Sequence, residues 1–183
     1  MKYKGSVVSA WIGLGSNMAN PAARISGAID RLGQEPQLTL ERVSSLYRTA
    51  PLEYLEQADF INAVARVSTI LGAEQLLERL VRIETELGRT RNGDRYGPRV
   101  IDLDLLLFSD EMHCTPALTV PHPRLHQRLF VLAPLAEIEG DMRLPDGSNL
   151  TIRVTACTGQ RVERMSAAAT TAAIDGVTNG SSY

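Results

Sequence analysis

The sequence predicts an α+β domain with an antiparallel sheet and helices packed on it. Three observations support this fold class. Apolar residues recur at helical spacing in segments 21–33 and 73–87, and four other segments have the apolar or alternating pattern of strands. In chain order these segments read strand, helix, strand, strand, helix, strand, which is the βαββαβ order of ferredoxin-like folds. The length of 183 residues and the 44% of hydrophobic residues suit one compact domain.

The first half of the chain supplies three of these elements. The first strand is expected over residues 7–14, and the GLGSN at its end is interpreted as a tight turn, because it lacks the sequence of a phosphate-binding P-loop. Asn20 followed by a proline favours a helix start, and Gly33 is expected to end helix 21–33. Residues 38–48 alternate only in part, which predicts a strand with a bulge.

The second half supplies the remaining elements. Residues 60–69 alternate as a strand, and residues 73–87 carry the stripe of leucine and isoleucine that is typical of an amphipathic helix. Residues 100–108 form the last predicted strand of the sheet. Three prolines argue against regular structure in residues 115–123. Residues 125–138 are predicted to be helical, with a kink or a break at their internal proline.

The end of the chain differs in composition from the rest. From about residue 155 onward Ala, Thr, Ser and Gly predominate, and large apolar side chains are scarce. Such a segment cannot bury enough apolar surface to order itself. We therefore predict a folded domain over residues 1–154 and a disordered tail over residues 155–183.

The composition argues against several classes of protein. A formal net charge of −2 indicates neither a nucleic-acid partner nor a membrane partner, and no apolar run approaches the roughly 20 residues that span a bilayer. The apolar segment after Lys2 and Lys4 is too short for an export signal. With only two cysteines, Cys114 and Cys157, we expect reduced thiols and a cytoplasmic protein.

Two carboxylates interrupt the apolar strand RVIDLDLLLF. Asp102 and Asp104 are two positions apart, so both side chains point to the same face of the strand, while Leu103 and Leu105 point to the other. Like charges this close repel each other unless cations intervene. Convergent carboxylates suit Mg²⁺, which completes its coordination with water and substrate phosphates. The alternative is an exposed sheet face on which each aspartate pairs with an arginine.

The loop before this strand, GRTRNGDRYGPR, is rich in arginine and glycine. Arg89, Arg91, Arg95 and Arg99 are opposed only by Asp94. Beside a divalent-metal site, guanidinium groups are suited to bind the oxygens of a polyphosphate. The alternative is a solvated, charged loop.

The segment VPHPRLHQRLF contains further candidates. His122 and His126 have the spacing of a zinc pair, but Pro123 argues against a helical turn there, and no third ligand is evident. A phosphate contact by His122 beside Arg128 fits better. Phe130 is suited either to stack on a flat ligand or to pack in the core.

Five stretches together resemble the 6-hydroxymethyl-7,8-dihydropterin pyrophosphokinases, a family of folate biosynthesis. They are IGLGSN (12–17), SSLYRTAPL (44–52), DFINAV (59–64), RIETELGRTRNGDRYGPRVIDLDLLLF (82–108) and TVPHPRLHQRLFVLAPLAEI (119–138). They occur in the family's order, from about residue 8 to about residue 150. The resemblance implies transfer of the β,γ-pyrophosphoryl group of ATP to the hydroxymethyl oxygen of the pterin, with release of AMP.

The resemblance also implies roles for individual residues. Asp102 and Asp104 match the carboxylates that hold two Mg²⁺ ions on the triphosphate, and together with Arg89, Arg99 and Arg128 they form the implied catalytic set. The implied contacts to ATP are Arg89, Arg91, Arg99, His122 and Thr119. The implied pterin pocket consists of Thr49, Ala50, Leu52, Phe60, Asn62, Phe130 and the lid aromatic Tyr96.

Three positions depart from the family pattern. Tyr96 stands where a Trp is familiar, Pro123 where a Tyr is, and Asn92 where a basic residue can occur, and these changes concern affinity more than reaction type. We expect a monomer whose partners are ATP and the pterin. Two other hypotheses are a non-catalytic binding module and a kinase acting at the γ-phosphate; the missing P-loop and kinase motifs weigh against the second.

Overall fold

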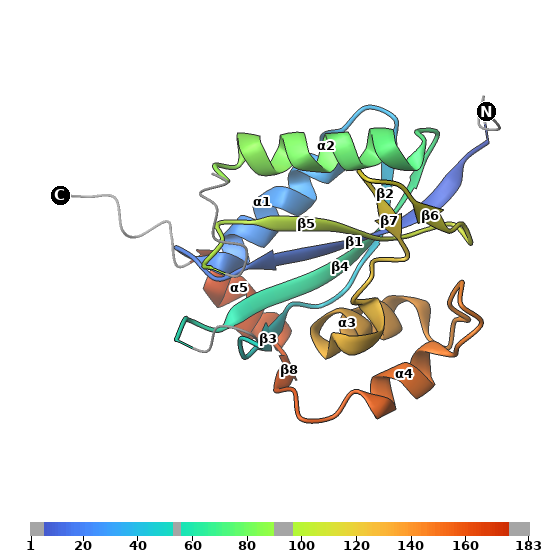
Figure 1. Cartoon of the computed structure of the whole chain (residues 1–183). Helices are drawn as coiled ribbons and strands as arrows, with labels where there is room; N and C mark the ends of the chain where they lie inside the picture. Colours follow the sequence, from blue (N-terminus) through green and yellow to red (C-terminus); the bar gives the residue numbers. More distant parts are fainter. Residues whose placement is uncertain (1–5, 53–55, 90–96, 176–183) are drawn as a thin grey trace.

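The computed structural model describes residues 6–52, 56–89 and 97–175. Its centre is a six-stranded sheet in which every neighbouring pair is antiparallel, ordered β5-β1-β4-β3-β8, with β2 also paired to β4 (Figure 1). The strands are β1 (Val8–Ser16), β2 (Leu38–Val43), β3 (Tyr47–Thr49), β4 (Phe60–Thr69), β5 (Asp102–Phe108) and β8 (Val162–Arg164). The predicted α+β class and the antiparallel sheet are confirmed.

Helices cover both faces of this sheet (Figure 1). The βαββαβ pattern by itself explains the helices on only one of these faces. On one face, α1 (Pro21–Gln34) and α2 (Ala73–Glu86) pack on alternate residues of β1 and β4, such as Ile12 and Ala65. On the other face, α3 (Leu129–Glu139) and α4 (Leu150–Ala156) pack around Trp11, Val64 and Leu106. The reason is the composition of α3, which is apolar enough to bury Val131, Leu132 and Leu135 against the sheet.

Two boundaries in the first half differ from the prediction for physical reasons. The side chain of Asn20 caps α1 by accepting a hydrogen bond from Ala23 N, as expected, but the helix continues through Gly33 and ends at Glu35, whose N–H bonds Leu32 O. The strand expected over 38–48 is divided into β2 and β3. Ser44 causes the division, because its Oγ accepts the N–H of Val64 in place of a ladder bond.

The segment before α3 also contains more structure than predicted. Residues 115–123 were expected to lack regular elements, yet β7 (Thr119–Val120) pairs with β6 (His113–Cys114) in a short ribbon. The prolines permit this because none of them occupies a paired position. The helix predicted over 125–138 is a 3-10 turn, η1 (Leu125–Gln127), followed by α3.

The C-terminal segment differs from the expected tail. β8 adds to the sheet edge beside β3, with Thr49 opposite Val162, and α5 (Ala167–Asp175) packs near α1. Composition does not reveal this arrangement, because backbone hydrogen bonds rather than large apolar side chains hold β8 in place. Residues 176–183 lie outside the described part of the chain. Among the described residues, no helix combines the length and the apolar character needed to cross a bilayer.

Candidate active site

A cavity of about 330 Å³ opens on the face of the sheet that carries α3. Its floor comes from β1, β4 and β5, and its walls come from the segment after β3 and from the segment that joins β5 to α3. It contains most of the polar residues singled out in the sequence. Its lining includes Thr49, Ala50, Leu52, Phe60, Asn62, Arg99, Asp102, Asp104, His122, Arg128 and Phe130.

The end of β1 forms the cavity floor, so GLGSN is not the tight turn expected from the sequence. Gly13 lies opposite Asp104 and Gly15 lies opposite both Asp102 and Asn62 in the strand register. A Cβ atom at position 15 would lie 2.9 Å from Asn62 Oδ1. Glycine is favoured there because the side chain of Asn62 on β4 approaches the backbone of β1 closely.

The last residues of β1 also hold the chain that leads into β5. Asn17 Oδ1 accepts a hydrogen bond from Arg99 N at 2.8 Å, and Asn17 N donates to Arg99 O at 3.1 Å. Ser16 Oγ donates to Val100 O at 2.6 Å. These bonds anchor the backbone of Arg99 at the cavity, although the preceding loop residues lie outside the described part of the chain.

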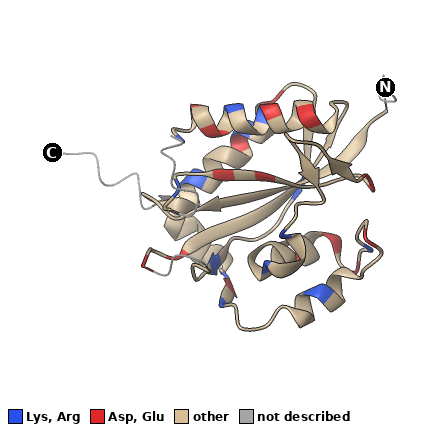
Figure 2. Ribbon diagram, in the orientation of Figure 1, with Lys and Arg blue, Asp and Glu red and all other residues tan. Residues whose placement is uncertain are grey.

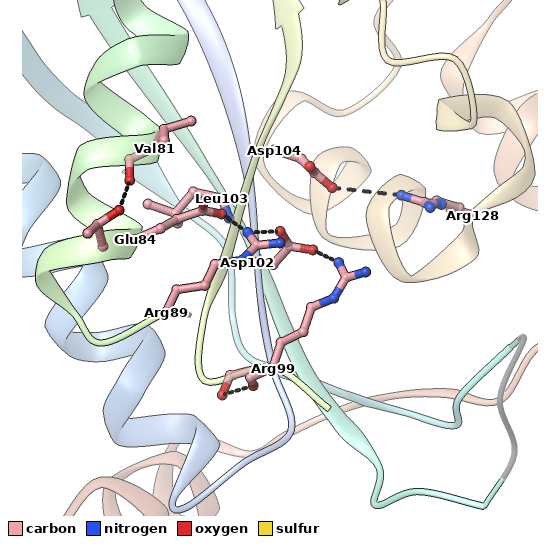
Figure 3. A network of polar contacts seen from close by, with 10 residues as sticks. Val81, Glu84, Arg89, Arg99, Asp102, Leu103, Asp104 and Arg128 are labelled. Atoms are coloured by element: carbon pink, nitrogen blue, oxygen red, sulfur yellow. Dashed lines mark hydrogen bonds and ion pairs between the residues drawn. The ribbon is translucent and has the colours of Figure 1, made fainter. Parts of the chain in front are cut away.

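Asp102 is already neutralised by arginine in this structure (Figure 3). One of its carboxylate oxygens contacts Arg89 Nη1 at 2.5 Å, and the other contacts Arg99 Nη1. Arg89 Nη1 also contacts Glu84, a buried carboxylate that accepts the N–H of Leu103 at 2.7 Å. The sequence interpretation paired these arginines with bound ATP; the structure shows that they balance Asp102 without it.

Asp104 lies on the same face of β5 but has a weaker partner. Arg128 Nη1 is 3.8 Å from its carboxylate (Figure 3), and its side chain is 40% exposed to the cavity. The crowded cavity still limits its hydration, and this burial, together with the charge of Asp102, raises the pKa of Asp104 to about 6. Figure 2 shows these acidic positions along β5. The predicted orientations are confirmed, because Leu103 and Leu105 belong to the core on the opposite face.

His122 is held in one tautomer by the backbone around it. The backbone N–H of His122 donates to Leu106 O at 2.9 Å. Its ring Nδ1 lies 3.1 Å from the backbone nitrogen of Arg124. Since Nδ1 accepts that N–H, the ring proton is on Nε2. Burial and the nearby charge of Arg128 lower the pKa of His122 to about 4, so the ring is neutral at pH 7. His126 instead contacts Asp146 at 3.4 Å, so the two histidines do not form a zinc pair.

The cavity lining also combines an amide with aromatic rings. Asn62 is buried and donates from Nδ2 to Thr49 Oγ1 at 2.8 Å. Phe60 and Phe130 both line the cavity, and the guanidinium of Arg128 lies 5.5 Å from the centre of the Phe130 ring. An amide in the same cavity as two aromatic rings is suited to a flat heterocycle with an amide-like edge.

Some residues predicted for the site are placed elsewhere. Thr119 is exposed on β7 and does not line the cavity, and Arg89 reaches the site only through Asp102. Arg91 and Tyr96 lie outside the described residues. Among the described residues, no group of three or more His, Cys, Asp or Glu side chains is arranged to hold a metal ion.

Two further residues belong to the site although sequence reasoning did not select them. Gln57 lines the cavity, and Glu84 lies behind it. Arg124, a basic candidate of the VPHPRLHQRLF segment, also lines the cavity. The available signal for Glu84 was a charge imbalance. Four arginines opposed by one aspartate in the loop leave cations with which a nearby carboxylate can pair, and a carboxylate that is buried is usually paired.

Comparisons with known proteins agree with this arrangement. The sequence profile of the 7,8-dihydro-6-hydroxymethylpterin-pyrophosphokinases matches residues 11–140, which include the floor of the cavity and both of its walls. The chain belongs to this family. Its reaction is therefore the pyrophosphokinase step of folate biosynthesis, and the resemblance drawn from the sequence motifs is confirmed.

Individual members of the family are similar to this chain over most of its length. A 2-amino-4-hydroxy-6-hydroxymethyldihydropteridine pyrophosphokinase of Pseudomonas aeruginosa is 43% identical over 155 residues, which cover 85% of this chain and 95% of the relative. The Bacillus subtilis protein of the same name is 49% identical over 129 residues, covering 70% of this chain and 77% of the relative.

The solved HPPK-DHPS of Plasmodium falciparum with pteroate has a TM-score of 0.66 at 14% identity, over 85% of this chain and 43% of that one. The likeness shows the shared fold, and this chain corresponds to less than half of the Plasmodium protein.

Proposed function

We propose that this pyrophosphokinase uses ATP as donor and binds the triphosphate over Asp102 and Asp104, with the pterin between Phe60 and Phe130. The observation that carries the proposal is the junction of two chemistries in one cavity. One part of the lining consists of two carboxylates among guanidinium groups, and another consists of a buried amide together with two phenylalanine rings. The first suits a polyphosphate with its cations, and the second suits the pterin.

Asp102 and Asp104 are the residues that would hold Mg²⁺. The raised pKa of Asp104 fits this assignment, because burial and the charge of Asp102 oppose its ionisation and a bound cation would offset both. Carboxylate oxygens are the ligand type that Mg²⁺ prefers, and two of them leave room for water and phosphate oxygens. Bound there, Mg²⁺ would supply charge neutralisation for the triphosphate.

The chain's own cations then act on the phosphates. Arg99 and Arg128 border the cavity, and each is suited to exchange part of its carboxylate contact for phosphate oxygens. His122, protonated on Nε2 and neutral, donates one hydrogen bond. Positioning and charge neutralisation account for most of phosphoryl-type transfer, so this arrangement needs no strong base.

The reaction forms a bond between the hydroxymethyl oxygen of the pterin and the β-phosphorus of ATP. The bond between the β-phosphorus and the oxygen of the α-phosphate breaks, AMP leaves, and the hydroxyl proton is released. Phe60, Phe130 and Asn62 orient the ring so that its hydroxymethyl group faces the phosphates.

Identifying the nucleotide product tests the proposal against its alternatives. The protein is incubated with ATP, Mg²⁺ and 6-hydroxymethyl-7,8-dihydropterin, and the nucleotides are separated by chromatography. AMP is the expected product. ADP would indicate a kinase acting at the γ-phosphate, and unchanged ATP would indicate a binding module.

Substitution of the carboxylates tests the residue assignment. Asp102→Ala and Asp104→Ala should each reduce AMP formation by at least about a hundredfold, the scale expected when an electrostatic contact to the reacting group is lost. Asp110→Ala is the matched control, because Asp110 lies in the turn after β5 and contacts only Ser109 among the hydrogen bonds found for it. Activity within a few-fold of wild type in either cavity variant would contradict the assignment.

A further inference from the structure

The C-terminal segment touches both walls of the cavity through two consecutive residues, Gln160 and Arg161. Both follow Gly159, whose φ of +76° is in the left-handed region that favours glycine and turns the chain toward β8. Gln160 faces the wall formed by η1 and α3, and Arg161 faces the wall formed by the segment after β3. Neither residue lines the cavity itself.

The side chain of Gln160 forms hydrogen bonds to the backbone on both sides of Arg128. Its Nε2 donates to Gln127 O at 2.8 Å, and its Oε1 accepts from Leu129 N at 2.9 Å. Arg128 stands between these two bonds with an extended backbone, φ −118° and ψ 93°, at the break between η1 and α3. The first turn of α3 has no side-chain cap of its own, so Gln160 supplies the acceptor that a capping residue normally provides.

Arg161 holds the opposite wall. Its carbonyl oxygen accepts the N–H of Ala50 at 3.2 Å, and its Nη2 contacts Asp59 Oδ1 at 2.6 Å. Ala50 lines the cavity, and Asp59 directly precedes Phe60, which also lines it. Because the Arg161 side chain is half exposed, the backbone bond rather than the ion pair is the firmer of these two contacts.

We propose that Gln160 and Arg161 are positioning residues that set the distance between the two walls and direct Arg128 at the phosphates. The inference rests on the proposed function, since it assigns Arg128 and the aromatic walls to the substrates. Two adjacent residues on one extended segment cannot move apart, so they couple the wall that carries Arg128 to the wall that carries Phe60. A displacement of about 1 Å in such a group is enough to lower a rate by up to about a hundredfold.

Gln160→Ala should lower kcat for AMP formation about tenfold or more, because the residues on either side of Arg128 lose their hydrogen bonds to Gln160. Gln160→Glu keeps the acceptor for Leu129 N but loses the donor to Gln127 O, so its kcat should fall between those of the wild type and Gln160→Ala. Arg164→Ala is the matched control. Arg164 follows on the same segment and contacts Glu137, near the C-terminal end of α3, and Ser45. Neither of these residues lines the cavity, so kcat should stay within about twofold.

A double-mutant cycle separates positioning from general stabilisation. If Gln160 acts through Arg128, Gln160→Ala should change kcat less than twofold when Arg128 is already alanine. Equal effects in both backgrounds would overturn the inference, as would wild-type kcat and KM in Gln160→Ala at temperatures well below unfolding. Failure of the proposed function appears separately, as a wild-type protein that forms no AMP.

Discussion

His122 illustrates how the cavity changes the chemistry of a single side chain. In an unfolded chain its pKa is about 6.5, whereas burial and Arg128 lower it to about 4 in the folded protein. The unfolded chain therefore binds a proton between these two pKa values that the folded protein does not. The stability that depends on a neutral His122 is therefore fully present above about pH 6.5. As the pH falls toward 4, protonation of the unfolded chain removes this stability.

Replacement of His122 should therefore flatten the acid side of the stability curve. His122→Gln removes the titrating group, so the free energy of unfolding should fall by about 1–2 kcal/mol less than in the wild type between pH 7 and pH 5. Urea unfolding at several pH values measures this slope. An equally steep loss in the variant would show that His122 does not titrate as proposed.

In the same cavity, the pKa of the Asp104 carboxylate shifts upward, opposite in direction to that of His122. Asp104 holds its proton more tightly than an ordinary aspartate, because Asp102 and the cavity walls oppose its ionisation. Both carboxylate oxygens of Asp102 contact arginines, Arg89 and Arg99. Two residues of the same type, two positions apart, thus differ in their partners, because the arginine nearest Asp104, Arg128, is 3.8 Å away.

At the scale of elements, β1 is the strand that makes the site possible. It lies between β4 and β5. Its Gly15 leaves space for Asn62 of β4, and its Gly13 and Gly15 lie opposite the two aspartates of β5 in the strand register. The same strand buries Ile12 and Leu14 on the opposite face, against α1 and α2. One strand therefore contributes a packed face to the core and an open face to the cavity.

Two glycine substitutions should have opposite effects. Gly15→Ala would place a methyl group 2.9 Å from Asn62 Oδ1 and should destabilise the protein by about 1–3 kcal/mol while weakening pterin binding. Gly27→Ala, in the interior of α1 with open space around it, should stabilise the protein by up to about 1 kcal/mol. Thermal unfolding and pterin titration measure both; unchanged binding in Gly15→Ala would contradict the proposed role of this position.

At the scale of the whole molecule, the C-terminal segment completes the site that the N-terminal elements begin. β8 extends the sheet beyond β3, and Gln160 and Arg161 tie its start to both cavity walls. Helix α5 then packs near α1 with mostly small and exposed side chains. Its contribution to stability should therefore be small.

Truncation at two places tests this division. A chain that ends after Ser166 loses α5 and should keep its rate of AMP formation within about twofold, with unfolding about 1–2 kcal/mol easier. A chain that ends after Cys157 also loses β8, Gln160 and Arg161, and its activity should fall at least tenfold. Equal activity of the two truncated chains would contradict a role for the strand and its two preceding residues.

The amino-acid sequence by itself determined the helices α1 and α2, the sheet strands β1, β4 and β5, and the family. Their signals are local: apolar periodicity in α2, the Asn20 cap of α1, and the alternation that sends Asp102 and Asp104 to one face of β5. Those signals need no knowledge of which distant segments meet.

Only the tertiary structure decided which partners these residues have. Three contacts depend on how segments that are separate in the sequence meet. Glu84 pairs with Arg89, and Asp102 pairs with arginines. Gln160 bonds the backbone beside Arg128 from 32 positions further along the chain. The tail was misjudged for the same reason. Backbone pairing, which any sequence can supply, placed β8 on the sheet, and a composition poor in large apolar residues carries no sign of it.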